Sequence, residues 1–319
     1  MTTGSVIVDL KGLVLDQEEV ELIKHPSVAG VLLFSRNYET EEQLRELTQS
    51  IRAARPGLII AVDQEGGRIQ RFREGFTALP AMRYWGNFYA EEPQEAIEDL
   101  HQMTVTMATE LQSVGVNMSF SPVLDIDHGL SDVISDRSFG SDPELCSILG
   151  DVVISSMKHA GMKSIAKHFP GHGSVVSDSH HEVSVDQRSR EEIWNTDLLP
   201  FKQLANKYDA VMPAHIIYPL VDDNVVTYSH YWLQTILRDQ LGFNGVIMSD
   251  DLTMFAASQV GDYSVRAEAA YAAGCDLLIA ANNREGAIDI LHVSEKVSLP
   301  KTNQRLENFL ASFAQEKIS

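Results

Sequence analysis

The feature that most constrains the fold of this chain is a repeated alternation of short apolar runs and amphipathic stretches. Eight runs rich in β-branched and other apolar residues recur from one end of the chain to the other: Val6–Leu10, Gly30–Phe34, Leu58–Asp63, Val116–Ser121, Ser164–His168, Ala210–Ala214, Gly245–Ser249 and Leu277–Ala280. They lack the polar–apolar alternation of a half-exposed sheet and are typical of parallel strands covered on both faces.

Helical segments or long loops separate these runs, and this order predicts an α/β fold, a single (β/α)8 barrel of the TIM type. The helical stretches are Glu41–Ala54, Gln94–Val114, Pro143–Ala160, Arg190–Asn206, Tyr231–Leu241, Ser264–Ala273 and Gly286–Lys296. A doubly wound open sheet is the alternative, but it would need fewer strands or a second domain. We find no linker or internal repeat, so we expect one catalytic domain over residues 1–319.

The amino-acid composition argues against nucleic acids and anionic membranes as binding partners. The 45 acidic residues outnumber the 25 basic ones and give a formal charge of −20, which disfavours nucleic acid and anionic membranes. Cys146 and Cys275 belong to no ligand or disulfide pattern, and the N-terminus does not resemble a signal peptide. No apolar run approaches the ~20 residues that span a bilayer. We therefore expect a cytoplasmic protein, and a monomer.

Ionisable side chains follow nearly every predicted strand, where the loops of a barrel converge on one mouth. They are Asp63, Asp125, Asp127, Lys167, His168, His215, Asp250 and Asp251. Long segments without periodicity, 65–84, 125–140 and 169–186, follow three of these strands. Loops of this length are usually functional, so we predict an active site at this end of the barrel.

The loop Lys167–Glu182 holds four histidines: His168, His172, His180 and His181. Asp178 and His180 are separated by one residue, so both side chains can face the same way in an extended turn. A carboxylate beside an imidazole fixes its tautomer and raises its basicity, which suits an acid/base catalyst. Zinc binding is the alternative, although the helical His-x-x-x-His spacing is missing and Lys167 would place a cation beside the metal.

Asp250 and Asp251 follow an uninterrupted apolar run in GVIMSDDLTM. One carboxylate can face the barrel mouth while the other turns back to the following loop or caps a helix, and capping suits Asp251 better. A carboxylate below an anomeric carbon can attack it or stabilise the oxocarbenium-like transition state. The usual scheme requires a second carboxylic acid, and the residues alone do not single one out.

Arginines accompany these acids. In GGRIQRFR, Arg71 follows Asp63, and Arg137 lies in ISDRSFG. A guanidinium can orient an aspartate or bind a substrate oxygen with two hydrogen bonds, so we expect both to contact substrate. Gly66–Gly67 has no phosphate-loop context around it.

At these motifs the chain closely resembles the glycoside hydrolase family 3 β-N-acetylglucosaminidases, in particular the short, single-domain type that bacteria use in peptidoglycan recycling. The motifs lie between about residues 31 and 283: LFSRNY, VDQEGGRIQRF, SFSPVLDID, DRSFG, AGMKSIAKHFPGHG, DSHHE, DAVMPAHIIY, LGFNGVIMSDDLTM and AGCDLLIAANN.

The resemblance implies a retaining double displacement in which Asp250 is the nucleophile. It implies that His180, paired with Asp178, is the proton shuttle that replaces the second carboxylate. By the same resemblance, the GlcNAc site is formed by Asp63, Arg71, Arg137, Lys167 and His168.

The implied substrate is a muropeptide fragment, GlcNAc joined β-1,4 to 1,6-anhydro-N-acetylmuramic acid, with or without its peptide. No metal or organic cofactor is expected. We expect no second α/β domain of the kind found in larger relatives, and we assign no role to residues beyond about 300. Phosphorolysis on the same fold and a metal-dependent amidohydrolase-like barrel remain alternatives, and a non-catalytic sugar-binding protein is a further one.

Overall fold

The computed structural model describes residues 4–175, 184–297 and 303–314. Within these residues, eight parallel strands form one sheet, and each strand overlaps one of the predicted apolar runs. The strands are β1 (Val6–Asp9), β2 (Val28–Leu33), β3 (Ile59–Val62), β6 (Met118–Ser119), β7 (Ile165–Phe169), β9 (Ala210–Pro213), β12 (Val246–Asp251) and β13 (Leu277–Ala280).

The sheet closes into a barrel whose strand order follows the chain. Strand β1 pairs in parallel with β2 on one side and with β13, the last strand, on the other. The sheet order is β6-β3-β2-β1-β13-β12-β9-β7, and its two ends meet through the parallel bridges Met118–Lys163 and Val123–Lys167. The predicted (β/α)8 barrel is therefore confirmed, and the open-sheet alternative is wrong.

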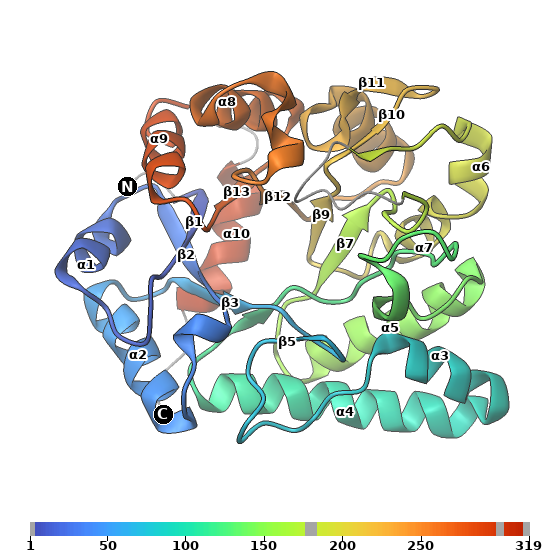
Figure 1. Cartoon of the computed structure of the whole chain (residues 1–319), viewed down its shortest axis with the longest axis horizontal. Helices are drawn as coiled ribbons and strands as arrows, with labels where there is room; N and C mark the ends of the chain where they lie inside the picture. The colour runs from blue at the N-terminus through green and yellow to red at the C-terminus, as the bar shows by residue number, and fades with distance from the viewer. Residues whose placement is uncertain (1–3, 176–183, 298–302, 315–319) are drawn as a thin grey trace.

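Helices surround this ring of strands (Figure 1). They are α1 (Gln17–Lys24), α2 (Glu41–Ala54), α3 (Met82–Glu91), α4 (Pro93–Ser113), α5 (Pro143–His159), α6 (Arg190–Asn195), α7 (Leu198–Leu204), the π-type helix η4 (Tyr231–Gln240), α8 (Tyr263–Ala273), α9 (Arg284–Ser294) and α10 (Asn303–Ala314). Several begin at a side chain that accepts a hydrogen bond from the first turn, such as Asp16, Thr40, Ser189 and Asp262.

The predicted helix Arg190–Asn206 is in fact two helices, α6 and α7. The break falls at Thr196, whose backbone leaves helical geometry with φ −123° and ψ −90°. Pro200 has no amide hydrogen and cannot donate to the carbonyl of Thr196, so a continuous helix would lose a bond there. The Asp197 carboxylate is fully buried at this break.

Helix α10 covers the end of the barrel where the strands begin. Its side chains Leu306, Phe309 and Phe313 belong to the same buried cluster as residues that fill the barrel interior, such as Ile7 and Met118. The Phe309 ring lies 5.9 Å from Nζ of Lys163, just before β7. Residues 303–314, which belong to a region to which we assigned no role from the sequence, thus cap the barrel core opposite its loop-rich mouth.

Short strands shape the loops at that mouth. A two-stranded hairpin of β4 (Gln64–Gly66) and β5 (Ile69–Gln70) follows β3. At its turn Gly66 has φ +118°, and a Cβ atom there would lie 2.3 Å from the carbonyl oxygen of Pro80. This turn explains why a Gly-Gly pair follows Asp63. Strands β8 (Ser184–Val185), β10 (Ile216–Tyr218) and β11 (Asp222–Val225) form a second small sheet.

Candidate active site

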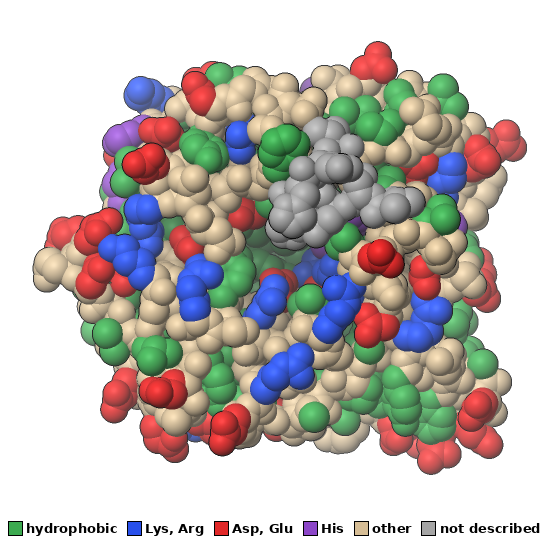
Figure 2. Space-filling view, in the orientation of Figure 1, with side chains coloured by type: hydrophobic (Ala, Val, Ile, Leu, Met, Phe, Trp, Pro, Cys, Tyr) green, Lys and Arg blue, Asp and Glu red, His purple; other side chains and the backbone are tan. Residues whose placement is uncertain are grey.

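A cleft of about 430 Å³ opens at the carboxyl ends of the barrel strands. Figure 2 shows a hollow in this face, with Lys and Arg side chains gathered beside it although the chain carries a formal charge of −20. The cleft is lined by residues from seven of the barrel strands and the loops that follow them, among them Phe34, Asp63, Arg71, Arg137, Lys167, His168, His172, Asp250, Asp251 and Asn282. The lining holds four cationic side chains and four carboxylates, and the cationic ones can donate hydrogen bonds to the oxygen atoms of a ligand.

A charged network links the ends of β3 and β7 in this cleft. The Lys167 ammonium lies 2.9 Å from Oδ1 of Asp63 and 2.6 Å from Oε1 of Glu65. Glu65 also accepts two hydrogen bonds of 2.8 Å from Arg137, in a bidentate pair. Nη2 of Arg71 lies 3.3 Å from Oδ2 of Asp63. The network holds Lys167, Arg137 and Arg71 in fixed positions at the edge of the cleft.

Burial and charge pairing together fix the ionisation of this network. Burial alone would raise the pKa of Asp63 and of Glu65, but neighbouring cations outweigh burial and hold both pKa values below their ordinary range. For Asp63 the main cation is Lys167, and for Glu65 it is Arg137. Burial would likewise lower the pKa of Lys167, but the two carboxylates raise it. Asp63, Glu65, Lys167 and Arg137 are therefore all charged at neutral pH.

Arg71 has hydrogen-bonding capacity left over. Its Nε atom is buried and has no hydrogen-bond partner among the described residues. The guanidinium carbon lies 5.8 Å from the centre of the Phe34 ring, which also lines the cleft. A buried N–H without a partner is costly, so a ligand oxygen in the cleft would supply what Arg71 lacks.

Asp125 orients the histidines beside the cleft. Its Oδ2 lies 2.7 Å from Nδ1 of His168, and its Oδ1 accepts hydrogen bonds from the backbone amides of His168 and His172 at 3.1 and 2.8 Å. With Nδ1 engaged, the Nε2 atom of His168 is the ring nitrogen available to a ligand. Burial lowers the pKa of His172 to about 4, so this imidazole is neutral at pH 7.

The two adjacent aspartates at the end of β12 face different partners, as the sequence predicted. Oδ1 of Asp251 accepts hydrogen bonds from the amides of Thr253 and Ala281, at 2.9 and 3.0 Å. The Asp250 carboxylate instead accepts a 2.7 Å hydrogen bond from the Asp251 amide and lines the cleft. The carbonyl oxygen of Asp251 in turn lies 3.1 Å from Nε2 of the buried His215.

Burial raises the pKa of Asp251 to about 7, although its hydrogen bonds lower it. A carboxyl group that holds its proton near neutrality adds little negative charge next to Asp250. Asp250 is therefore the better placed of the two to meet a developing positive charge.

The structure brings six of the predicted site residues to one cleft: Asp63, Arg71, Arg137, Lys167, His168 and Asp250. Asp178 and His180 lie outside the described residues. Sequence reasoning missed Glu65, and it included Asp125 only as a strand-end acid. The position of Glu65 two residues after Asp63 in VDQEGG is a signal that could have found it, because alternate residues of an extended segment share a face.

Two observations concern metal binding and membrane insertion. Among residues 4–175, 184–297 and 303–314, no group of three His, Cys, Asp or Glu side chains could hold a metal ion. Over the same residues, no helix combines the length and apolar character needed to cross a membrane.

Comparison with known proteins identifies the family. The glycosyl hydrolase family 3 N-terminal domain matches residues 6–310. A β-hexosaminidase of Hydrogenovibrio crunogenus is 48% identical over 96% of this chain and 86% of its own length. The crystal structure of NagZ from Neisseria gonorrhoeae in complex with a zinc ion has a TM-score of 0.88 and 38% identity, covering 98% of this chain and 94% of that one.

The same Neisseria protein in complex with N-trifluoroacetyl-D-glucosamine has a TM-score of 0.87 and 38% identity, and the match covers 97% of this chain and 89% of that one. The matches extend over nearly the whole chain and include every strand of the barrel. This chain therefore belongs to glycosyl hydrolase family 3 and is a glycoside hydrolase.

Proposed function

We propose that this enzyme is a retaining exo-β-N-acetylglucosaminidase, in which Asp250 forms a covalent glycosyl intermediate. The observation that carries the proposal is the convergence of Asp250 with Asp63, Lys167, Arg137 and His168 on one cleft of about 430 Å³. This volume is within the range of small-molecule sites, about 300–1,000 Å³. The relatives called β-hexosaminidase and NagZ support the choice of an N-acetylhexosamine.

In the first step, a carboxylate oxygen of Asp250 attacks the anomeric carbon as the bond to the leaving oxygen breaks. His180 gives its proton to that oxygen, and Asp178 keeps the imidazole in the correct tautomer. In the second step, neutral His180 takes a proton from water while the water oxygen attacks the anomeric carbon. The bond to Asp250 breaks, GlcNAc leaves with retained configuration, and both side chains return to their starting states.

The ionised network around Glu65 binds the sugar. Asp63 accepts hydrogen bonds from hydroxyl groups, while Lys167, Arg137 and Arg71 donate to hydroxyl and carbonyl oxygens. His168 donates or accepts through Nε2, because Asp125 occupies Nδ1. Each of these groups is already fixed by a protein partner, so little ordering is needed when the substrate binds.

The proposed natural substrate is GlcNAc joined β-1,4 to 1,6-anhydro-N-acetylmuramic acid, with or without its peptide. The Lys and Arg side chains beside the cleft favour a leaving group that carries carboxylates. By the same proposal, the enzyme acts in peptidoglycan recycling in the cytoplasm. It is a monomeric, single-domain protein that needs no metal or organic cofactor.

A fluorinated GlcNAc donor that accumulates the glycosyl-enzyme tests the nucleophile. We expect mass spectrometry of a protease digest to find the sugar on the peptide that carries Asp250, and fragmentation to place it on that residue. An adduct on Asp251 or on any other residue would overturn the mechanism. The same digest of Asp250→Ala is the control, and it should carry no sugar.

Product analysis separates hydrolysis from phosphorolysis. In phosphate buffer, free GlcNAc indicates a hydrolase, whereas GlcNAc-1-phosphate would indicate a phosphorylase. Because phosphate would take the place of water only in the second step, trapping of Asp250 is expected in either case.

A further inference from the structure

We infer that His215 is a positioning residue for the nucleophile: from the end of β9 its side chain holds the backbone of Asp251, which in turn orients the Asp250 carboxylate. The inference rests on the proposed role of Asp250. In the sequence, His215 is one of the ionisable side chains that follow predicted strands, and the proposed double displacement does not use it. The residue is nevertheless buried, and a buried imidazole needs partners for its ring nitrogens.

The imidazole of His215 has a polar group beside each ring nitrogen. Nε2 lies 3.1 Å from the carbonyl oxygen of Asp251, and Nδ1 lies 2.9 Å from Oγ1 of the fully buried Thr227. A carbonyl oxygen can only accept a hydrogen bond, so Nε2 carries a hydrogen and donates it to Asp251. In the neutral imidazole Nδ1 is then an acceptor, to which the Thr227 hydroxyl group donates. Thr227 thus favours the tautomer that the contact with Asp251 requires.

Asp251 connects His215 to the nucleophile through its backbone. Its carbonyl oxygen accepts a 3.1 Å hydrogen bond from the Met254 amide as well as the one from His215, so both of its lone pairs are used. Its own amide donates the 2.7 Å hydrogen bond to Oδ1 of Asp250. Because peptide units are planar, holding the carbonyl of Asp251 limits the directions in which its amide can point.

Backbone pairing in the barrel does not by itself hold this segment in register. The pairing of β12 with β9 extends to Ile247 and Val211, and Asp250 lies three residues beyond Ile247. On the other side, the register of β12 with β13 shifts between Met248 and Asp251. The imidazole therefore links the ends of β9 and β12 beyond their paired residues.

His215 is itself held in place by the chain on either side of it. The Ala214 amide donates to the carbonyl oxygen of Phe169, at the end of β7, at 2.8 Å. Strand β10 begins at the next residue, Ile216, and pairs with β11. The imidazole also stacks on the ring of Tyr228, with 6.5 Å between the ring centres and 25° between the planes. The imidazole thus has little freedom to move away from Asp251.

The position of Asp250 should matter more for the reaction rate than for sugar binding. The attacking atom must approach the anomeric carbon to about 3–3.5 Å, and a misplacement of about 1 Å can cost a factor of about a hundred. The groups proposed to bind the sugar hydroxyls lie at the ends of β3 and β7 and in the loop that carries Arg137. Loss of the His215 hydrogen bond should therefore slow formation of the glycosyl-enzyme and leave the affinity for GlcNAc nearly unchanged.

The test measures two quantities: the rate at which the fluorinated GlcNAc donor labels the enzyme, and the Kd for GlcNAc by calorimetry. We expect His215→Leu to slow labelling about tenfold or more and to change Kd by less than about threefold. His215→Gln offers an amide N–H in place of Nε2 and should recover most of the labelling rate. Equal losses in rate and affinity, or an unchanged labelling rate, would overturn the inference.

Thr227→Val tests the same link if His215→Leu fails to fold. The change removes the hydroxyl group beside Nδ1 and keeps a β-branched side chain of similar shape. We expect labelling to slow about threefold or more, with the Kd for GlcNAc again nearly unchanged. Thr227→Ser keeps the hydroxyl group and should be labelled at close to the wild-type rate. Slow labelling of Thr227→Ser, equal to that of Thr227→Val, would contradict the role given to the hydroxyl group.

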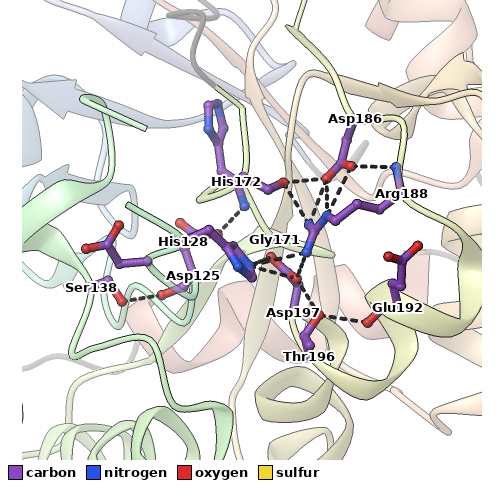
Figure 3. A network of polar contacts seen from close by, with 12 residues as sticks. Asp125, His128, Ser138, Gly171, His172, Asp186, Arg188, Glu192, Thr196 and Asp197 are labelled. Atoms are coloured by element: carbon purple, nitrogen blue, oxygen red, sulfur yellow. Dashed lines mark hydrogen bonds and ion pairs between the residues drawn. The ribbon is translucent and has the colours of Figure 1, made fainter. Parts of the chain in front are cut away.

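Two variants control for the loss of an ordinary hydrogen bond. Tyr228→Phe keeps the ring that stacks on His215 and removes the 2.9 Å hydrogen bond that the hydroxyl group donates to a backbone carbonyl. Thr196→Val removes a 2.7 Å hydrogen bond to Asp197 in the polar network at the break between α6 and α7 (Figure 3). Both variants should be labelled at close to the wild-type rate. Labelling as slow as that of Thr227→Val in either control would show that the effect is not specific to the contact with Asp251, and the inference would fail.

The residue that carries the label separates this inference from the proposed function. If the label is on Asp250 and forms at the wild-type rate in His215→Leu and Thr227→Val, His215 does not position the nucleophile and the proposed function stands. If the label in the wild-type enzyme is on another residue, the proposed function fails and the inference fails with it.

Discussion

The backbone amide of Asp251 donates a 2.7 Å hydrogen bond to Oδ1 of Asp250, while the carboxylate of Asp251 is held by Thr253 and Ala281. Two adjacent acids are thereby given different environments by one short segment at the end of β12. Both residues are half-buried and line the cleft; the Asp250 carboxylate is hydrogen-bonded to the Asp251 amide, and the pKa of Asp251 is raised to about 7.

The raised pKa of Asp251 predicts a pH-dependent contribution to stability. A carboxyl group has an ordinary pKa near 4 in an unfolded chain, so between about pH 4 and pH 7 the folded state binds this proton more tightly than the unfolded state. The contribution is full below pH 4 and is lost as the pH rises through 7. We expect the difference in urea midpoint between wild type and Asp251→Asn to shift in favour of the variant over this window. A difference that stays constant from pH 4 to pH 8 would contradict the assignment.

Asp250→Ala should reduce turnover of an aryl GlcNAc glycoside by at least about a thousandfold, because the covalent route is lost. Binding of GlcNAc, measured by calorimetry, should change little, since Asp63, Lys167 and Arg137 keep their positions. Near-normal turnover would show that another residue is the nucleophile.

Glu65→Gln should weaken substrate binding more than it slows catalysis. The change removes the negative charge that lies between Lys167 and Arg137. Both cations are largely shielded from solvent, so each loses part of the negative charge that balances its own. Breaking a buried ion pair costs about 3–5 kcal/mol, so we expect a lower urea midpoint together with a KM raised about tenfold or more.

The control for Glu65→Gln is Glu74→Gln, an exposed carboxylate in the same β3–α3 segment. This variant should match wild type in both stability and KM. A KM for Glu65→Gln within the error of wild type would indicate that Lys167 and Arg137 do not bind the sugar.

Chelation is expected to leave the enzyme active. The proposed double displacement uses Asp250 and His180 and needs no Lewis acid. After treatment with EDTA and removal of the chelator, kcat/KM should stay within about twofold of the untreated value. Loss of activity that zinc restores would instead favour the metal-dependent alternative.

The barrel was predictable because its signal is local. Each of the eight strands is a short apolar run whose residues are buried on both faces, and this pattern is visible without any partner strand. Helix α10 was not predicted, because nothing in the local pattern of Asn303–Ala314 indicates that Phe309 and Phe313 cap a barrel assembled from residues far earlier in the chain.

The site was partly predictable for the same reason. Asp63, Lys167 and Asp250 are adjacent to strand ends, so the fold alone places them at one mouth. The roles of Glu65 and Asp125 depend on partners 72 and 43 positions away, Arg137 and His168, which no local pattern links to them. Asp178 and His180 lie outside the described residues, and their roles remain predictions from the resemblance.

The cap that α10 places on the barrel has a consequence for the order of events in each turnover. With the interior filled by side chains and its far end covered, a ligand in the cleft beside Asp250 cannot pass along the barrel axis and leave at the far end. In the proposed double displacement, the leaving group must therefore depart on the same side of the barrel from which water arrives. We expect released GlcNAc to be the last product out and to compete directly with incoming substrate.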